Sequence, residues 1–273
     1  MDVEAFLAEA ASWARGRPDV RALLLVGSQA RTEAPADEFS DVDLVVVVDE
    51  PAPYVESAAW LEPFGDTLLT FVEPTAVGPL LERRVLFESG LEVDFSLVPA
   101  ALMRDLLAEP EIRGVFARGY RVLHDELGLD EDLALAARFM PAPMTQAELA
   151  RLSSDFWYHV LWAAKKLRRG ETFVAKQACD CYLKSLLVGL LAATVRARDP
   201  EADTWHRARF LELWAPPAEL DELRATYAAY DAADIARAIK ATAEMFRRLE
   251  LELGSRVEHD ELVRRLHALL GVS

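Results

Sequence analysis

The sequence is poor in cysteine, in long apolar runs and in targeting signals. Its 273 residues include two cysteines, Cys179 and Cys181, and on a helix two positions this close face different ways, which disfavours a disulfide or a shared metal ion. We interpret both as small buried residues in a reducing compartment. The longest apolar stretch, residues 186–195, is too short to span a bilayer, and the acidic N-terminus lacks the basic and apolar regions of a secretory signal. These absences predict a cytoplasmic protein that does not enter a membrane.

Positive charge is scarce as well. The chain has 30 Lys and Arg against 46 Asp and Glu, a formal net charge of −16 at pH 7. This balance disfavours nucleic acid or an anionic membrane surface as a partner and favours a cationic one, although acidity by itself also aids solubility. The 52% apolar content and the lack of low-complexity tracts indicate a folded chain, long enough for one large or two ordinary domains.

A short apolar run at residues 22–26 ends at Gly27 and Ser28. Such a run is typical of a buried strand that ends in a tight turn. Glycine lets the backbone approach a ligand closely, and a helix that began at Ser28 would favour an anion at its N-terminus. The alternative is an ordinary turn. Our prediction is that Gly27 and Ser28 bind the phosphates of a nucleotide.

Two acidic residues, Asp41 and Asp43, stand two positions apart at the head of a β-branched run. On a strand their side chains project from one face, where two carboxylates repel each other unless a cation lies between them. Mg²⁺ suits this position because it takes one or two carboxylates and fills its other sites with water and phosphate oxygens. Taken alone, Asp41 is more simply a strand cap, so the functional interpretation depends on the whole set of motifs.

A third acid is expected from the strand at residues 92–98, which a Ser-Gly turn joins to the strand before it. Its alternation puts Val93, Phe95 and Leu97 on one face and Glu92, Asp94 and Ser96 on the other. This hairpin would bring Asp94 beside Asp41 and Asp43. We choose Asp94 as the third acid, with Glu92 as its alternative.

The rest of the chain predicts an α+β architecture in two domains. Strand and helix signals alternate through residues 1–140, which predicts a mixed sheet with flanking helices. Pro141 and Pro143 break this pattern, and almost no strand signal follows. The capping-box spacing from Thr145 to Glu148 starts a predicted helix that runs to Arg169. Residues 141–273 are therefore predicted to form an α-helical bundle, with further helices at about 173–198, 204–213, 218–228, 232–253 and 258–270.

Two features of the helical half bear on binding. Lys176 and Lys184 lie eight residues apart on an otherwise apolar helix and would share a face; a lysine that faced the nucleotide would neutralise phosphate charge, and Lys176 is the stronger candidate. Aromatic residues here are expected in the core, where bundles need bulk, although one near a cleft is able to stack on an adenine or a sugar. They include Phe156, Trp157, Trp162, Phe173, Trp205, Phe210 and Trp214.

The order of a Gly-Ser turn, an Asp-x-Asp pair and a later strand acid resembles the nucleotidyltransferase superfamily related to DNA polymerase β. Almost end to end, the chain also resembles the aminoglycoside 6-adenylyltransferases, also called streptomycin adenylyltransferases. The segments that carry this resemblance are LLVGSQAR, DEFSDVDLV, WLEPFGDTLL, LFESGLEVDFSLVP, FWYHVLWAAKKLRRG, RFLELWAPPAELDELRATYAAYDAADI and AEMFRRLELELG. The family carries an Arg where this chain has Gln29 and usually an aromatic where it has Val42; both departures fall next to the predicted nucleotide site.

The resemblance implies transfer of AMP from ATP to a hydroxyl of an aminoglycoside, with streptomycin as the first candidate, and hence antibiotic resistance. It implies a polymerase-β-like nucleotidyltransferase domain in which Asp41 and Asp43 bind Mg²⁺, Gly27 and Ser28 hold the triphosphate, and Asp94 completes the metal site or deprotonates the acceptor. The partners expected are ATP and a cationic small molecule, with no nucleic acid and no membrane, and the protein is expected to be a monomer.

Two other functions stay open on the sequence. One is adenylylation of a protein or of another small hydroxyl compound; the large helical half disfavours a protein acceptor. The other is a nucleotide-binding homologue without turnover, which three clustered carboxylates disfavour because they repel one another without a metal. The sequence does not select the aminoglycoside or the residues that contact it, and the general base could also be Glu92 or an acid of the helical half.

Overall fold

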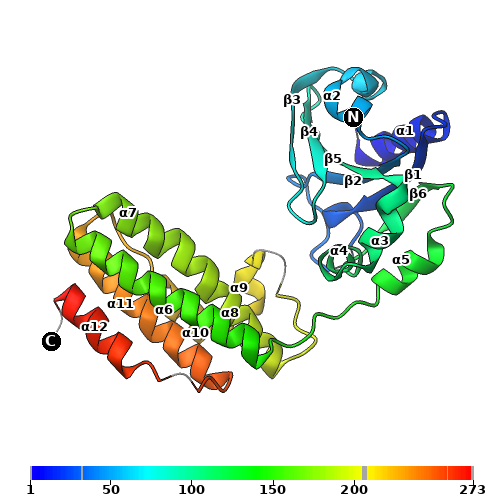
Figure 1. Cartoon of the computed structure of the whole chain (residues 1–273). Helices are drawn as coiled ribbons and strands as arrows, with labels where there is room; N and C mark the ends of the chain where they lie inside the picture. The colour runs from blue at the N-terminus through cyan, green and yellow to red at the C-terminus, as the bar shows by residue number, and fades with distance from the viewer. Residues whose placement is uncertain (1, 32, 205–207, 257, 272–273) are drawn as a thin grey trace. The chain divides into compact units, whose positions relative to one another are not determined.

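The computed structural model describes residues 2–31, 33–204, 208–256 and 258–271 (Figure 1). The chain divides into two compact units, Met1–Pro141 and Ala142–Ser273. The first is built on a mixed sheet and the second is helical. Each unit has its own buried hydrophobic core.

The first unit contains a six-stranded sheet of order β3-β4-β5-β2-β1-β6. Only β2 and β5 run parallel; the other four neighbouring pairs are antiparallel. The parallel pair lies near the middle of the sheet, so the residues that head these two strands meet at one edge. The strands are β1 (Val20–Val26), β2 (Val42–Val48), β3 (Thr67–Pro74), β4 (Leu81–Phe87), β5 (Glu92–Pro99) and β6 (Arg121–Asp125).

Both faces of this sheet are covered, and the alternation of each strand decides which residues serve which face. Leu23 and Leu25 of β1 pack with α1 (Val3–Arg15), α2 (Ala52–Glu56) and the 3-10 turn η2 (Ala59–Phe64). Ala22, Leu24 and Val26 pack with α3 (Met103–Ala108), α4 (Pro110–Phe116) and α5 (Asp130–Ala136). The short turn η3 (Ala100–Leu102) leads from β5 into α3.

The second unit begins with the long helix α6 (Gln146–Arg168), whose capping box joins Thr145 and Glu148 as predicted. The helical run from Thr172 to Arg198 follows, as α7 (Thr172–Gln177), a π turn η4 (Ala178–Tyr182) and α8 (Leu183–Arg198). By length and composition this run could cross a membrane, contrary to the expectation that its apolar stretch is too short, and half of its apolar window is buried in the unit. The remaining helices are α9 (Leu211–Trp214), α10 (Pro217–Ala225), α11 (Ala232–Glu252) and α12 (Asp260–Leu270).

Several expectations for the helical half need correction. Phe156 and Trp157 are buried as predicted, but Phe173, in the first turn of α7, is 61% exposed. Cys179 is buried, whereas Cys181 is exposed. Trp162, Phe210 and Trp214 are half-buried. Trp205 and part of the predicted helix at 204–213 lie outside the described residues, and the regular helix there is only α9.

Candidate active site

A glycine turn at the end of β1 forms the first part of the site. Gly27 has φ +70, in the left-handed region that favours glycine, and a Cβ there would lie 1.8 Å from the Asp43 Oδ2 atom. The Ser28 side chain is buried and its hydroxyl donates to the Asp41 carbonyl over 3.3 Å. Glycine therefore allows the turn and the Asp-x-Asp strand to lie against each other.

The turn is shorter than the sequence suggests. The helix expected from Ser28 is a single 3-10 turn, η1 (Gly27–Gln29). A turn of three residues has no appreciable helix dipole, so this part of the prediction is wrong. What remains available to an anion is the backbone N–H groups of the turn and a nearby hydroxyl.

Three carboxylates come together beside this turn. Asp43 on β2 is the direct neighbour of Asp94 on β5 in the parallel ladder, and Asp41 lies two residues before Asp43 on the same face. One oxygen from each carboxylate lies within 4.8 Å of the others, the only such group of three found among the described residues. Val93, Phe95 and Leu97 point into the core on the opposite face, as predicted. Glu92 is exposed at the start of β5 and is not part of the group.

Asp94 is the most buried of the three, with 9% of its surface exposed. Its other neighbour across the sheet is Arg84 on β4, whose Nη1 lies 3.2 Å from the Asp94 Oδ2 atom. The same guanidinium contacts Glu82, with Nη2 2.9 Å from Oε1, and also pairs with Glu73. Burial raises the pKa of Asp94 to about 6; Arg84 opposes this rise, and the neighbouring Glu82, Asp41 and Glu73 carboxylates add to it.

The donor set fits a hard divalent cation. Three carboxylate groups supply only oxygen ligands, which is the chemistry that Mg²⁺ prefers, and Asp41 and Asp43 are half-exposed, so that a substrate is able to supply further ligands. A cation between the three groups would also relieve the repulsion that helps raise the Asp94 pKa. Asp41, Asp43 and Asp94 are thus the residues able to hold a metal.

The match to a known family covers nearly the whole chain. Residues 3–263 match the family model for streptomycin adenylyltransferase. The chain belongs to this family. One curated relative is the aminoglycoside 6-adenylyltransferase of Bacillus subtilis (strain 168), which is 23% identical over 222 residues; the match covers 76% of this chain and 74% of the relative. Another is the aminoglycoside 6-adenylyltransferase of Campylobacter jejuni, which is 21% identical over 215 residues; this match covers 76% of this chain and 73% of the relative.

Two solved structures also align with the chain. A crystal structure of an aminoglycoside 6-adenyltransferase from Bacillus subtilis aligns with a TM-score of 0.45 and 16% identity, covering 98% of each chain. A spectinomycin adenyltransferase from Enterococcus faecialis, crystallised with ATP and spectinomycin, aligns with a TM-score of 0.29 and 12% identity, again over 98% of each chain.

The two departures from the adenylyltransferase pattern differ in what they affect. Gln29 is the last residue of the η1 turn, whose first residue, Gly27, lies against Asp43. Val42 stands between the paired acids in sequence, but its side chain is fully buried in the core on the other face of the sheet. Val42 is next to the paired acids in the chain, but strand alternation turns its side chain away from the face that carries them.

Lys176 and Lys184 lie in the helical unit. The Lys176 Nζ donates to the Ala228 carbonyl over 2.7 Å and pairs with Asp180. Lys184 is 4% exposed and its Nζ donates to Thr242 Oγ1 over 2.8 Å; burial lowers the Lys184 pKa. The π turn η4 lies between the two lysines, and both reach the same neighbouring segment: Lys176 contacts the Ala228 carbonyl, and the Lys184 Nζ lies 5.2 Å from the Tyr227 ring centroid. Phosphate binding by Lys176 stays a prediction.

Proposed function

We propose that this protein transfers AMP from ATP to a hydroxyl of an aminoglycoside and releases pyrophosphate, with streptomycin as the first acceptor to test. The observation that carries the proposal is the Asp41, Asp43 and Asp94 group beside the Gly27 turn, in a member of the streptomycin adenylyltransferase family. The names of both curated relatives, aminoglycoside 6-adenylyltransferase, support this acceptor class.

In the proposed reaction, the acceptor oxygen attacks the α-phosphorus of ATP and the bond to the pyrophosphate oxygen breaks. Gly27 and Ser28 border the space for the phosphates, and Asp41 and Asp43 hold Mg²⁺. When bound, Mg²⁺ neutralises phosphate charge and acts as a Lewis acid toward the transferring phosphoryl group. Asp94 takes the proton of the acceptor hydroxyl, since it is a buried carboxylate adjacent to the metal-binding pair.

The acceptor is proposed to be cationic because the chain is strongly acidic. A formal charge of −16 attracts a polycation over several ångströms before contact, and this attraction is screened by salt. Aminoglycosides combine several ammonium or guanidinium groups with many hydroxyls, so one molecule offers both the attraction and the nucleophile.

A panel assay tests the function. The purified chain is incubated with ATP, Mg²⁺ and single aminoglycosides, and both pyrophosphate release and product mass are recorded. We expect an AMP adduct on streptomycin or a close analogue, no product when Mg²⁺ is chelated, and weaker acceptor binding as salt rises. AMP adducts found only on uncharged sugars or on a protein hydroxyl would contradict an aminoglycoside acceptor but would still agree with AMP transfer from ATP. No adduct on any acceptor would contradict the function.

Arg84 is expected to position Asp94 in this reaction. Arg84→Gln should lower kcat by about tenfold to a hundredfold with little change in KM for ATP, because Asp94 loses the partner that fixes its carboxylate. Arg84→Gln should also lower the free energy of unfolding by about 1–2 kcal/mol. The cause is that Glu82, which is only 6% exposed, loses its cationic partner. The loss is limited because the Arg84 side chain is 39% exposed and its charge is partly screened by solvent.

Arg21→Gln is the matched control for Arg84→Gln. Arg21 lies in the same sheet, bridges Asp49 and Glu126, and has a side chain that is 35% exposed, but it does not contact Asp94. Steady-state kinetics and thermal unfolding of both variants separate the two roles. If Arg84→Gln and Arg21→Gln lower kcat by the same factor, Arg84 has no special role in orienting Asp94.

A further inference from the structure

The sheet face that carries Asp43 and Asp94 continues across β4 to the edge strand β3. In the strand ladders Asp94 is the direct neighbour of Arg84, and Arg84 is the direct neighbour of Phe71. Direct neighbours project from the same face of a sheet, so Asp43, Asp94, Arg84 and Phe71 form one row of side chains from β2 to β3. Neighbouring strands lie about 4.8 Å apart, which places Phe71 about 10 Å from Asp94 along this row.

The β3 end of the row is apolar and exposed. Phe71 is 45% exposed, and Leu69, two residues earlier on the same face, is 57% exposed. Glu73, two residues later on this face, is half-buried. Sheet edges usually carry charged residues or proline, because exposed apolar side chains on an edge strand promote aggregation. Exposed apolar residues in line with the catalytic carboxylates therefore indicate a surface that is covered when a substrate binds.

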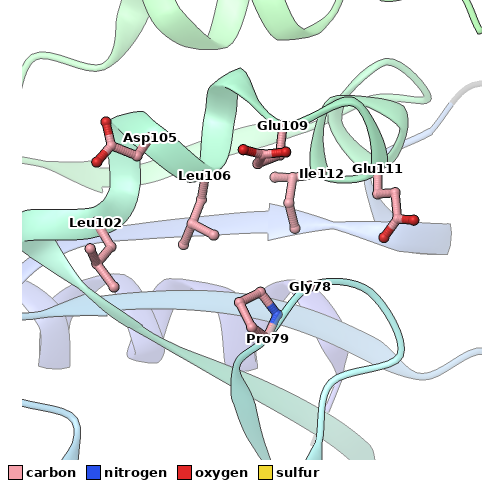
Figure 2. Close-up of a pocket in the computed structure, with 8 residues that line it drawn as sticks. All are labelled: Gly78, Pro79, Leu102, Asp105, Leu106, Glu109, Glu111 and Ile112. Carbon is pink, nitrogen blue, oxygen red and sulfur yellow. The ribbon is translucent and has the colours of Figure 1, made fainter.

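Beyond Glu73 the same face of the sheet is already covered. The loop of residues 75–80 packs on α3 and α4, and a Cβ on Gly78 would lie 3.0 Å from the Ile112 Cδ1 atom. Figure 2 shows Leu106 and Ile112 pointing toward Pro79 of this loop. The exposed part of this face of β3 is thus the stretch of residues 69–73, next to the row that contains Asp94.

The direction of the proposed reaction determines which substrate lies there. In phosphoryl transfer the attacking and leaving oxygens lie roughly in line, on opposite sides of the phosphorus atom. Gly27, where the phosphates are proposed to bind, follows Val26, which neighbours Asp43 on the β1 side. Asp94, the proposed base, neighbours Asp43 on the β5 side. Pyrophosphate therefore leaves toward β1, and the acceptor approaches from β5 and extends over β4 and β3.

The charge of this region matches a cationic acceptor. The Arg84 guanidinium is shared by Glu73, Glu82 and Asp94, and one guanidinium against three carboxylates leaves a net formal charge of −2. Glu82 is buried, whereas the side chain of Glu73 is 41% exposed. Glu73 is therefore the carboxylate of this group that a cationic group on β3 is able to reach, while a neutral adenine ring would gain no such attraction.

We propose that Phe71 and Glu73 recognise the acceptor of the reaction. A ring of the acceptor packs its C–H face on Phe71, and a cationic group of the acceptor lies beside Phe71 and pairs with Glu73. The inference rests on the adenylyl transfer proposed above and adds residues that select the acceptor. Asp41, Asp43 and Asp94 keep the roles assigned to them there.

Phe71→Ala in the full chain tests the role of the ring, with Phe71→Tyr as the conservative variant. Steady-state kinetics uses the aminoglycoside that gives the AMP adduct, with streptomycin first. Calorimetry measures its binding in the presence of Mg²⁺ and an ATP analogue whose methylene bridge between the α and β phosphorus atoms prevents transfer. Phe71→Ala should raise both KM and Kd for the acceptor about tenfold and leave KM for ATP unchanged. Phe71→Tyr should restore the values of the wild type.

Leu81→Ala is the matched control for the loss of the ring. Leu81 is 40% exposed on β4, but it neighbours Leu97, whose side chain points into the core on the opposite face. Its substitution should leave KM for the acceptor unchanged.

Glu73→Gln tests the charge in the same calorimetric experiment. It should weaken acceptor binding about threefold, and the difference from the wild type should shrink as salt rises, because the contact is electrostatic. Glu88→Gln, at an exposed position in the turn between β4 and β5, removes the same charge and should have no such effect. Equal losses in Glu73→Gln and Glu88→Gln would show diffuse attraction only and overturn the role of Glu73.

The outcomes separate this inference from the proposed function. An AMP adduct with an unchanged acceptor KM in Phe71→Ala would overturn the inference and leave the proposed function in place, whereas the absence of any adduct with the wild type would overturn both. An equal rise in KM for ATP would assign Phe71 to the nucleotide, and an equal loss in Leu81→Ala would show a general effect on the β3–β4 pair. A dimer that Phe71→Ala dissociates in sedimentation velocity, with acceptor KM unchanged, would assign the strand to self-association. Each of these three results would overturn the inference. If Phe71→Ala does not fold, Phe71→Leu, which keeps an apolar side chain without the ring, decides by the same comparison.

Discussion

Asp43→Asn is expected to reduce turnover by at least about 10³-fold while leaving the fold intact. Asp43 is the central member of the carboxylate group, because it neighbours Asp94 in the β2–β5 ladder and its carboxylate lies against Gly27. Asparagine has nearly the same shape, so the substitution removes a charge and a metal ligand without a new clash. Loss of metal-assisted charge stabilisation costs several kcal/mol in the transition state, which corresponds to this factor.

Glu92→Gln is the control for this substitution. It removes the same charge from the same sheet, but Glu92 is exposed and lies outside the carboxylate group. Its pyrophosphate release should stay close to that of the wild type. Near-normal pyrophosphate release by Asp43→Asn at saturating Mg²⁺ would show that Asp43 is not a ligand of the catalytic metal. A Glu92→Gln variant as inactive as Asp43→Asn would instead identify Glu92 as the general base.

Asp94→Asn should preserve binding of ATP with Mg²⁺ and lower kcat by about 10²–10⁴-fold. The expectation follows from the assignment of Asp94 as general base, with metal contact as its secondary role. The Asp41 and Asp43 pair, which is half-exposed beside the Gly27 turn, would still bind the metal and the nucleotide. Calorimetry of nucleotide binding and single-turnover kinetics measure the two effects separately.

The two roles of Asp94 give different patterns in that experiment. A loss of nucleotide affinity as large as in Asp43→Asn would show that Asp94 is chiefly a metal ligand. Full activity would move the base to Glu92 or to an acid of the helical unit. Arg84 stays in place in this variant and still neutralises Glu82 and Glu73, so folding should be little affected.

Short-range patterns predicted much of the first unit. Strand alternation placed Val93, Phe95 and Leu97 in the core and Asp94 on the opposite face, and the predicted Ser-Gly turn joins β4 to β5 as an antiparallel pair. These features depend on the period of a strand and on local turn chemistry, which neighbouring residues determine. Membership in the adenylyltransferase family, expected from the order of many segments, is confirmed.

Features that depend on distant pairings were not predictable. The contact of Arg84 with Asp94 requires the register of β4 on β5, and the approach of Asp43 to Gly27 requires the register of β2 on β1. The π turn at Ala178–Tyr182 leaves no clear mark in an apolar helical sequence, so this break in the regular helix was not predicted. The closed loop at Gly78 and its packing on Ile112 were missed for the same reason, since nothing nearby in sequence determines them.

Binding of Mn²⁺, a spectroscopic substitute for Mg²⁺, tests the central claim most directly. Electron paramagnetic resonance of the nucleotide-free protein distinguishes bound from free Mn²⁺, and competition with Mg²⁺ reports the affinity of the natural ion. We predict one saturable, Mg²⁺-displaceable site in the wild type and in Glu92→Gln, and an affinity at least about tenfold lower in Asp43→Asn, which lacks a ligand carboxylate. Equal Mn²⁺ affinity in the wild type and in Asp43→Asn would contradict the assignment of Asp41, Asp43 and Asp94 as the metal site.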